Sequence, residues 1–247
     1  MYRIHCSEIW GGIKNEDVDA CSAVLTSSLY SSACDGGKGG DIYFFSVCQG
    51  DLLTRIAIAD VVGHGEKVSR VSQWLYDSLH ERMNGGDGGE ILAELNRLAN
   101  ERGQDALTTA AIIGFYRPDS SVYFAYAGHH PMLIRRRGTA RWQAVPLEVS
   151  SAKLANLPLG IEYNVRYDEQ FVPVEAGDRV FLYTDGVTET PAPDGQLFGD
   201  ERLRALLDEV GGKSPYELKT AVLMKLREHA GGELTHDDVT LLAIEVR

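Results

Sequence analysis

Five short segments with the composition of β-strands follow one another between residues 106 and 184. Their sequences are LTTAAIIGFY, SVYFAYAG, PMLIRRR, VRYDEQFVPV and DRVFLYTD, and Gly, Pro or Asp bounds each of them. Aromatic and β-branched residues between such turn residues are typical of strands. Two earlier segments, 42–48 (IYFFSVC) and 52–59 (LLTRIAIA), have the same character. The chain is therefore predicted to build its core from many consecutive strands.

Helical periodicity occurs on both sides of this strand-rich region. Apolar residues recur at helical spacing in 66–83 and 91–103 before it, and in 203–210 and 218–226 after it. A last strand, DDVTLLAIEV, closes the chain, and Trp10-Gly11-Gly12 is predicted to begin a sheet edge. Strands in series between helix pairs favour an α+β fold, in which helices cover antiparallel sheets, over alternating βαβ units. We expect one domain spanning residues 1–247.

Aspartates mark four of the predicted strand ends. Asp41 precedes IYFFSV, Asp60 ends RIAIA, Asp185 ends RVFLYT, and Asp237 and Asp238 open the last strand. Strand ends hold side chains rigidly, and converging carboxylates would repel one another unless hard divalent cations such as Mg²⁺ or Mn²⁺ bound them. Aspartate is equally common as a turn residue or helix cap. Spacing alone leaves both interpretations open.

The charge of the chain argues against a polyanionic partner. The formal net charge is −12, so nucleic acid and anionic membranes are not attracted overall. The only basic run, RRR at 135–137, is typical of a solvated hairpin end. The sequence has no signal-peptide pattern and no apolar run of membrane-spanning length. Its four cysteines form no C-x-x-C pair, which predicts reduced thiols in a cytoplasmic protein.

A series of motifs resembles one enzyme family. GGD before a strand, ADVVGHG, YAGHHP, LPLG, LYTDGVTET, DGQLFGDERL and DDVTLLAIEV occur in its order, from about residue 38 to the end. The sequence resembles the metal-dependent PPM-type (protein phosphatase 2C-like) serine/threonine phosphatases, in particular the SpoIIE/RsbU branch. This resemblance implies an α-β-β-α sandwich, with two antiparallel sheets flanked by helix pairs and two Mn²⁺ or Mg²⁺ ions at one edge.

The resemblance also implies a ligand set. Asp41, Asp60 and Asp185 match acidic metal ligands, Asp60 as the bridging one, and the backbone carbonyl of Val61 adds a contact. Asp237 matches the last ligand, with Asp238 as the less favoured of that pair. Two positions depart from the family pattern: Phe44 replaces an acid that often follows GGD, and His130 replaces a proline. Loss of the acid is expected to weaken an accessory metal site.

The chemistry that follows is attack of a metal-activated water on a phosphate monoester, centred on Asp60 and Asp185. His64 is a candidate proton donor to the leaving group, or else orients its neighbours. His129 is either a hydrogen-bonded loop histidine or part of the site.

The partner expected from the resemblance is a small phosphorylated regulatory protein, such as an anti-sigma-factor antagonist. We expect its docking rim to comprise 129–137 and 190–199, with His129 at the rim and Arg135, Arg136 and Arg137 meeting acidic residues. Two alternatives remain: a partner-binding module with little catalysis, and a phosphatase of small phosphoesters.

Overall fold

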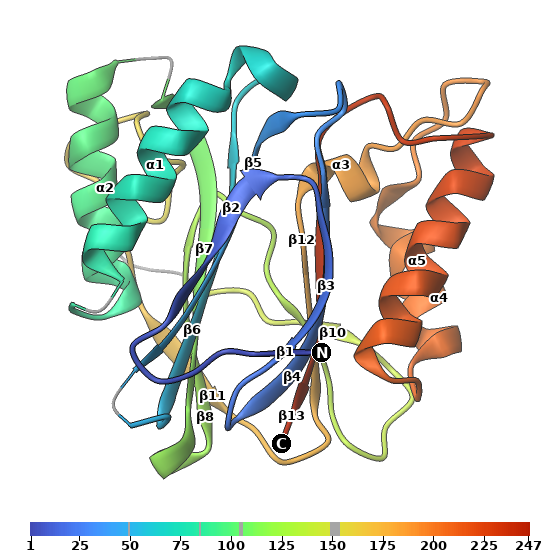
Figure 1. Cartoon of the computed structure of the whole chain (residues 1–247), viewed down its shortest axis with the longest axis horizontal. Helices are drawn as coiled ribbons and strands as arrows, with labels where there is room; N and C mark the ends of the chain where they lie inside the picture. The colour runs from blue at the N-terminus through green and yellow to red at the C-terminus, as the bar shows by residue number, and fades with distance from the viewer. Residues whose placement is uncertain (49, 84, 104–105, 149–153) are drawn as a thin grey trace.

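Two β-sheets lie face to face in the computed structural model, and a pair of helices covers the outer face of each (Figure 1). The structure describes residues 1–48, 50–83, 85–103, 106–148 and 154–247. The sheets are mostly antiparallel, and β1 with β3 is a parallel pair. The α+β class and the α-β-β-α sandwich predicted from the sequence are confirmed.

The first sheet is six-stranded, in the order β11-β8-β7-β6-β5-β2. Its strands are β2 (Ile9–Lys14), β5 (Lys38–Cys48), β6 (Leu53–Val61), β7 (Thr108–Tyr116), β8 (Ser121–Ala127) and β11 (Gln170–Pro173). β2 is an edge strand, as the Trp10-Gly11-Gly12 segment predicted. The segment VRYDEQFVPV contributes only the four residues of β11.

The second sheet is seven-stranded, in the order β1-β3-β4-β13-β12-β9-β10. Its strands are β1 (Tyr2–Arg3), β3 (Glu16–Cys21), β4 (Leu25–Ser32), β9 (Leu133–Arg135), β10 (Gln143–Ala144), β12 (Arg179–Tyr183) and β13 (Val239–Val246). The family-like motifs begin only at about residue 38, yet β3 and β4, which precede them, form part of this sheet.

The helices form where helical periodicity predicted them. α1 (Ser69–Arg82) and α2 (Gly88–Arg102) cover the six-stranded sheet, and α4 (Gly199–Val210) and α5 (Pro215–Ala230) cover the other (Figure 1). Ser214 caps α5 through a capping box with Glu217, and Gly231 ends it with φ 71°. A short helix, α3 (Asp185–Thr188), follows β12. No helix in the described ranges is both long and apolar enough to cross a membrane.

Strand alternation divides the apolar side chains between layers. In β5, Tyr43 and Phe45 pack between the sheets, whereas Ile42 and Phe44 face the helices. Residues two apart share a face of a strand. Asp41 therefore lies on the same side as Tyr43 and is directed between the two sheets.

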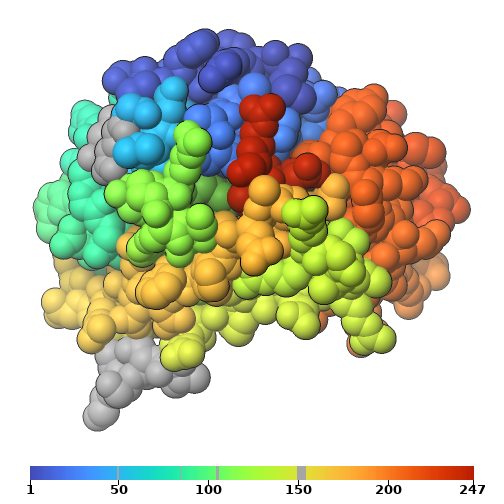
Figure 2. Space-filling view, turned by 90° about the horizontal axis from the view of Figure 1, so that it is seen from below, coloured from blue at the N-terminus to red at the C-terminus, as the bar shows by residue number. Residues whose placement is uncertain are grey.

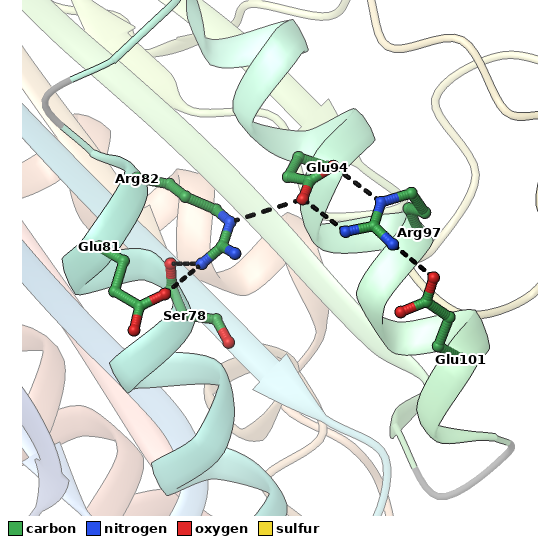
Figure 3. Close-up of polar contacts among 6 residues, drawn as sticks. All are labelled: Ser78, Glu81, Arg82, Glu94, Arg97 and Glu101. Atoms are coloured by element: carbon green, nitrogen blue, oxygen red, sulfur yellow. Dashed lines mark hydrogen bonds and ion pairs between the residues drawn. The ribbon is translucent and has the colours of Figure 1, made fainter.

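Surface ion pairs link the two helices that cover the six-stranded sheet (Figure 3). Arg82 of α1 lies 3.9 Å from Glu94 of α2, and Glu94 also pairs with Arg97 at 2.7 Å. Arg97 pairs in turn with Glu101. These side chains are partly exposed, and exposed pairs contribute roughly 0–1 kcal/mol each. The apolar faces of α1 and α2 therefore account for most of their attachment to the sheet.

Candidate metal centre

Asp41 and Asp60 lie directly opposite each other on β5 and β6. Ile56 and Ile58 pack between the sheets, so Asp60, two residues further along the same face, is directed there too. Opposed residues of an antiparallel pair have Cβ atoms about 4.5–5.5 Å apart, and like charges in that position repel. The fold thus places two carboxylates together at the end of the layer between the sheets.

The seven-stranded sheet brings the other predicted aspartates to the same end. Asp185 follows β12, and Asp237 and Asp238 precede β13, its antiparallel neighbour. Thr184, beside Asp185, donates a hydrogen bond of 2.8 Å from Oγ1 to Asp41 Oδ2 and so joins the two sheets. Sequence reasoning did not identify Thr184, although it lies within the YTDG motif. In Figure 1 this end is at the top, beside α3.

Burial and like charge dominate the electrostatics of this cluster. Burial, with Asp238 and Asp185 nearby, raises the pKa of Asp41 well above its usual value, although hydrogen bonds from Thr184 and Thr240 act in the opposite direction. Burial and the four neighbouring aspartates raise the pKa of Asp60 to about 10. A cation at this position would favour the ionised forms.

The donor set matches hard divalent cations. It consists of carboxylate oxygens, which Mg²⁺ and Mn²⁺ prefer. Within the described ranges, no three His, Cys, Asp or Glu side chains are already arranged around one ion-sized position. Side-chain rotation would therefore have to complete a centre there. Phe44, at the position where the resemblance led us to expect another acid, is fully buried against the helices and cannot contribute.

Asp238 differs from the other aspartates because backbone donors occupy its carboxylate. It is 2% exposed and accepts hydrogen bonds from the amides of Cys34 at 2.8 Å, Gly40 at 2.5 Å and Gly65 at 2.9 Å. These amides belong to three separate segments around the carboxylate cluster. Asp237 has only a local bond, from the Asp238 amide at 2.7 Å. Asp238 thus ties these segments together, whereas Asp237 keeps oxygens free.

His64 is exposed at the turn that follows Asp60. Its Nδ1 lies 3.2 Å from Cys34 Sγ. Burial raises the pKa of Asp237, and the hydrogen bond from the Asp238 amide lowers it. His236 instead has Nε2 2.9 Å from the Gly186 carbonyl. Cys34 carried no signal in the sequence, since no motif includes it.

The two histidines of YAGHHP occupy different environments. His129 is 8% exposed, its Nδ1 lies 2.9 Å from the His130 carbonyl, and burial lowers its pKa to about 4. It therefore does not present its ring to a partner, contrary to the predicted rim role. His130 stacks on Tyr183 with ring centroids 5.3 Å apart, one residue before Thr184.

The basic run lies at the wrong end of the sandwich for the predicted rim. Arg135 pairs with Arg179 at the start of β12, six residues before Asp185. At about 3.3 Å per residue this separation is roughly 20 Å. Arg136 bonds Asp178 at 2.9 Å, and Asp178 also accepts the amide of Arg137 at 2.7 Å. These arginines therefore do not flank the aspartates, as the predicted rim required.

Figure 2 views this opposite end, where the last residues of the chain, in red, lie beside the green 116–121 segment and the orange 174–178 segment. A pocket of about 340 Å³ opens there, lined in part by Phe115, Val174 and Val246.

The second predicted rim segment, 190–199, is placed differently. It follows α3 directly, and Thr190 Oγ1 bonds the Gly186 carbonyl at 2.8 Å.

Comparisons with known proteins agree with this geometry. The family model for Stage II sporulation protein E (SpoIIE) matches residues 51–247. Phosphoserine phosphatase RsbU of Bacillus subtilis is 27% identical over 212 residues, which are 83% of this chain and 58% of RsbU. The chain thus spans little more than half of that relative.

Solved structures share the fold. The PP2C phosphatase domain with a regulatory fragment of SpoIIE from Bacillus subtilis superposes with a TM-score of 0.74 at 20% identity, covering 97% of this chain and 71% of that one. RsbX, solved in complex with magnesium, gives 0.67 at 17% identity, covering 94% and 100%. With a family model that matches most of its length, and with the PP2C-type sandwich of the SpoIIE/RsbU branch, this chain belongs to the SpoIIE family.

Proposed function

We propose that this protein is a metal-dependent protein-serine/threonine phosphatase. The observation that carries the proposal is the meeting of Asp41 and Asp60 from one sheet with Asp185 and Asp237 from the other. A partner-binding module without catalysis has no need for this repulsive cluster. The name of the relative RsbU, a phosphoserine phosphatase, supports the same reaction.

The proposed ligands of two Mn²⁺ or Mg²⁺ ions are the carboxylates of Asp41, Asp60, Asp185 and Asp237. The carbonyl of Val61 completes the set. A Cβ at position 40 would lie only 2.9 Å from this carbonyl oxygen, so the glycine there keeps it uncrowded. When bound, the ions would supply an activated water and offset charge on the phosphoryl oxygens. Asp238 is left out of the ligand set because its oxygens already accept three backbone amides.

His64 is the proposed proton donor to the leaving-group oxygen. It is exposed at the turn that follows Asp60, and its Nδ1 contacts Cys34 Sγ at 3.2 Å, so Nε2 can face a substrate. A thiol is both a weak donor and a weak acceptor, so Cys34 can hold the imidazole in its neutral and its protonated form. Asp238 fixes this pair, because it binds the amides of Cys34 and of Gly65, next to His64.

The proposed substrate is a phosphoserine or phosphothreonine of a small regulatory protein, of the anti-sigma-factor-antagonist type that the resemblance implies. The aspartates lie at or beside the ends of β5, β6, β12 and β13, at one end of the sandwich. A folded phosphoprotein can reach such an edge.

Metal removal tests the proposal as a whole. We expect hydrolysis of p-nitrophenyl phosphate and of a phosphoserine peptide with Mn²⁺ or Mg²⁺, and loss of both activities in EDTA with recovery when Mn²⁺ is returned. The physical reason is that the ions supply the activated water. Released phosphate is the measurement, and equal turnover with and without EDTA would contradict the metal-dependent reaction.

Replacement of His64 tests the proton donor. His64→Ala should lower kcat on a phosphoserine peptide by about a hundredfold and change p-nitrophenyl phosphate hydrolysis little, because nitrophenolate leaves without a proton. Cys34→Ala should lower the same kcat less, and Cys34→Ser, which keeps a hydroxyl near Nδ1, should recover part of the loss. Equal losses on both substrates would assign His64 a structural role.

A further inference from the structure

A polar pocket of about 620 Å³ lies where the start of β5 meets the start of α1. Its lining residues are Lys38, Glu66, Lys67, Ser69, Arg70 and Gln73. It is formed between the beginning of β5 and the turn that leads from His64 into α1, near the top of Figure 1. Both segments also carry proposed site residues, Asp41 on β5 and His64 before the turn.

Positive charge is concentrated here on a chain whose net charge is −12. Lys38, Lys67 and Arg70 are exposed, and Glu66 is the one acid among the lining residues. The register adds Lys14, an exposed residue of β2 that lies directly opposite Lys38. Two like charges in that position repel each other. A bound anion would relieve this repulsion.

The cations around this pocket are not neutralised by acids of the protein. Within the described ranges, none of Lys14, Lys38, Lys67 and Arg70 forms an ion pair. By contrast, Arg136, part of the basic run that the sequence suggested as a docking rim, already binds Asp178. Arginines and lysines that have no partner in the protein are available to an external anion. We call Lys14, Lys38, Lys67 and Arg70 the basic pocket.

The spacing between the basic pocket and the carboxylates suits a peptide. Lys38 and Asp41 are three residues apart on β5, or roughly 10 Å at about 3.3 Å per residue, and this odd spacing turns their side chains to opposite faces of the strand. The basic pocket therefore opens on the helix side of the strand end, whereas the aspartates face the layer between the sheets. An extended substrate segment that passes over this strand end, with a phosphoserine at the aspartates, would place a side chain about three positions away near the basic pocket.

We propose that the basic pocket binds an acidic side chain that lies about three residues from the phosphorylated serine or threonine of the protein substrate. This inference rests on the proposed function and specifies which phosphoproteins the site selects. It assigns to the start of β5 and of α1 the charge recognition that the Arg135–Arg137 run, at the far end of the sandwich, cannot perform.

Matched phosphopeptides test this selection. Each peptide carries one phosphoserine and either Glu or Gln, placed three residues before it, three residues after it or eight residues away. The wild-type protein with Mn²⁺ is expected to show a kcat/KM about fivefold higher for Glu than for Gln at one of the two near positions and no preference at the distant one. The preference should decrease as salt is added, because exposed charges are screened.

Charge reversal identifies the residues responsible. In Lys38→Glu/Lys67→Glu, the kcat/KM for the Glu peptide divided by that for the Gln peptide should fall to one or below. A peptide with Lys at the same position should become the better substrate. Lys213→Glu is the matched control, because Lys213 is an exposed lysine in the turn between α4 and α5. The Glu-to-Gln ratio of kcat/KM for Lys213→Glu should equal that of the wild type. If charge reversal disturbs folding, the milder variant Lys38→Gln/Lys67→Gln replaces it, and its Glu-to-Gln ratio should fall to about one.

The outcomes separate the two levels of proposal. Absence of Mn²⁺-dependent hydrolysis of every substrate would contradict the proposed function itself. Hydrolysis with a Glu-to-Gln ratio near one at both near positions would overturn the basic pocket alone. A preference that survives in Lys38→Glu/Lys67→Glu would also overturn it, and inhibition by sulfate without any peptide preference would assign the pocket to small anions.

Discussion

Asp60→Asn is expected to lower kcat by roughly a thousandfold at saturating Mn²⁺ while the fold is retained. Asp60 faces Asp41 directly across two strands and has every other aspartate of the cluster as an electrostatic neighbour. An amide keeps the size of the side chain but removes the charge that would bind the cations. Asp185→Asn should behave in the same way, because it removes a charge from the opposite sheet. Phosphate release at several Mn²⁺ concentrations is the measurement.

The same substitution should have the opposite effect on stability without metal. Burial and four neighbouring carboxylates raise the pKa of Asp60 to about 10, so ionisation of this residue at neutral pH opposes folding. A raised folded-state pKa means that stability is lost as pH rises toward that value, and asparagine removes this loss. In EDTA at pH 8, Asp60→Asn should therefore melt at a higher temperature than the wild type.

Asp77→Asn is the control for both measurements. Asp77 lies on the surface of α1 and accepts a hydrogen bond of 3.0 Å from Gln73. Its replacement should leave turnover and melting temperature near those of the wild type. If Asp60→Asn keeps near wild-type kcat at saturating Mn²⁺, Asp60 is not a metal ligand.

Much of the architecture could be predicted because the strands and helices have clear patterns. Aromatic and β-branched residues between turn residues identified β5 and β6, and helical spacing identified the four long helices of the described ranges. The aspartates at strand ends could be located, but their convergence required the pairing of β5 with β6 and of β12 with β13. β5 and β6 follow each other in the chain, but β12 and β13 are far apart in sequence, and no local pattern encodes their pairing or the packing of one sheet on the other.

β4 shows why part of the fold was missed. Its sequence, LTSSLYSS, contains four serines, which do not suggest a buried strand. Ser27, Ser28 and Ser31 are nevertheless buried, because each finds a hydrogen-bond partner, namely the Ala20 carbonyl, Asp19 and Thr240 respectively. Buried polar groups are tolerated when they are paired, and the partners here become known only from the tertiary structure.

The basic run failed as a docking prediction for a related reason. Its position after YAGHHP suggested proximity to the site, but β9 carries the chain away from the aspartates to the end at which β12 begins. Asp178, itself 2% exposed, then binds Arg136 and the amide of Arg137. A cluster of arginines in the sequence does not reveal whether an internal acid already neutralises it.

Asp238→Ala is expected to lower the free energy of unfolding by about 3 kcal/mol or more, far beyond the effect of Asp237→Ala. The two aspartates are adjacent in sequence but differ in their hydrogen bonds. Asp238 accepts three amides from separate segments, and its loss would leave buried N–H groups without acceptors, at about 1–3 kcal/mol each. Asp237 accepts one local amide and is partly exposed.

Urea unfolding in EDTA measures this difference without a contribution from bound metal. Asp238→Asn should fall between the wild type and Asp238→Ala, because the amide oxygen still accepts while its NH₂ faces other N–H donors. Activity should separate the pair in the opposite sense: Asp237→Ala stays folded but needs far more Mn²⁺ for turnover. If Asp238→Ala were as stable as the wild type and only its Mn²⁺ requirement rose, Asp238 rather than Asp237 would be the ligand, and the three amide bonds would be dispensable for stability.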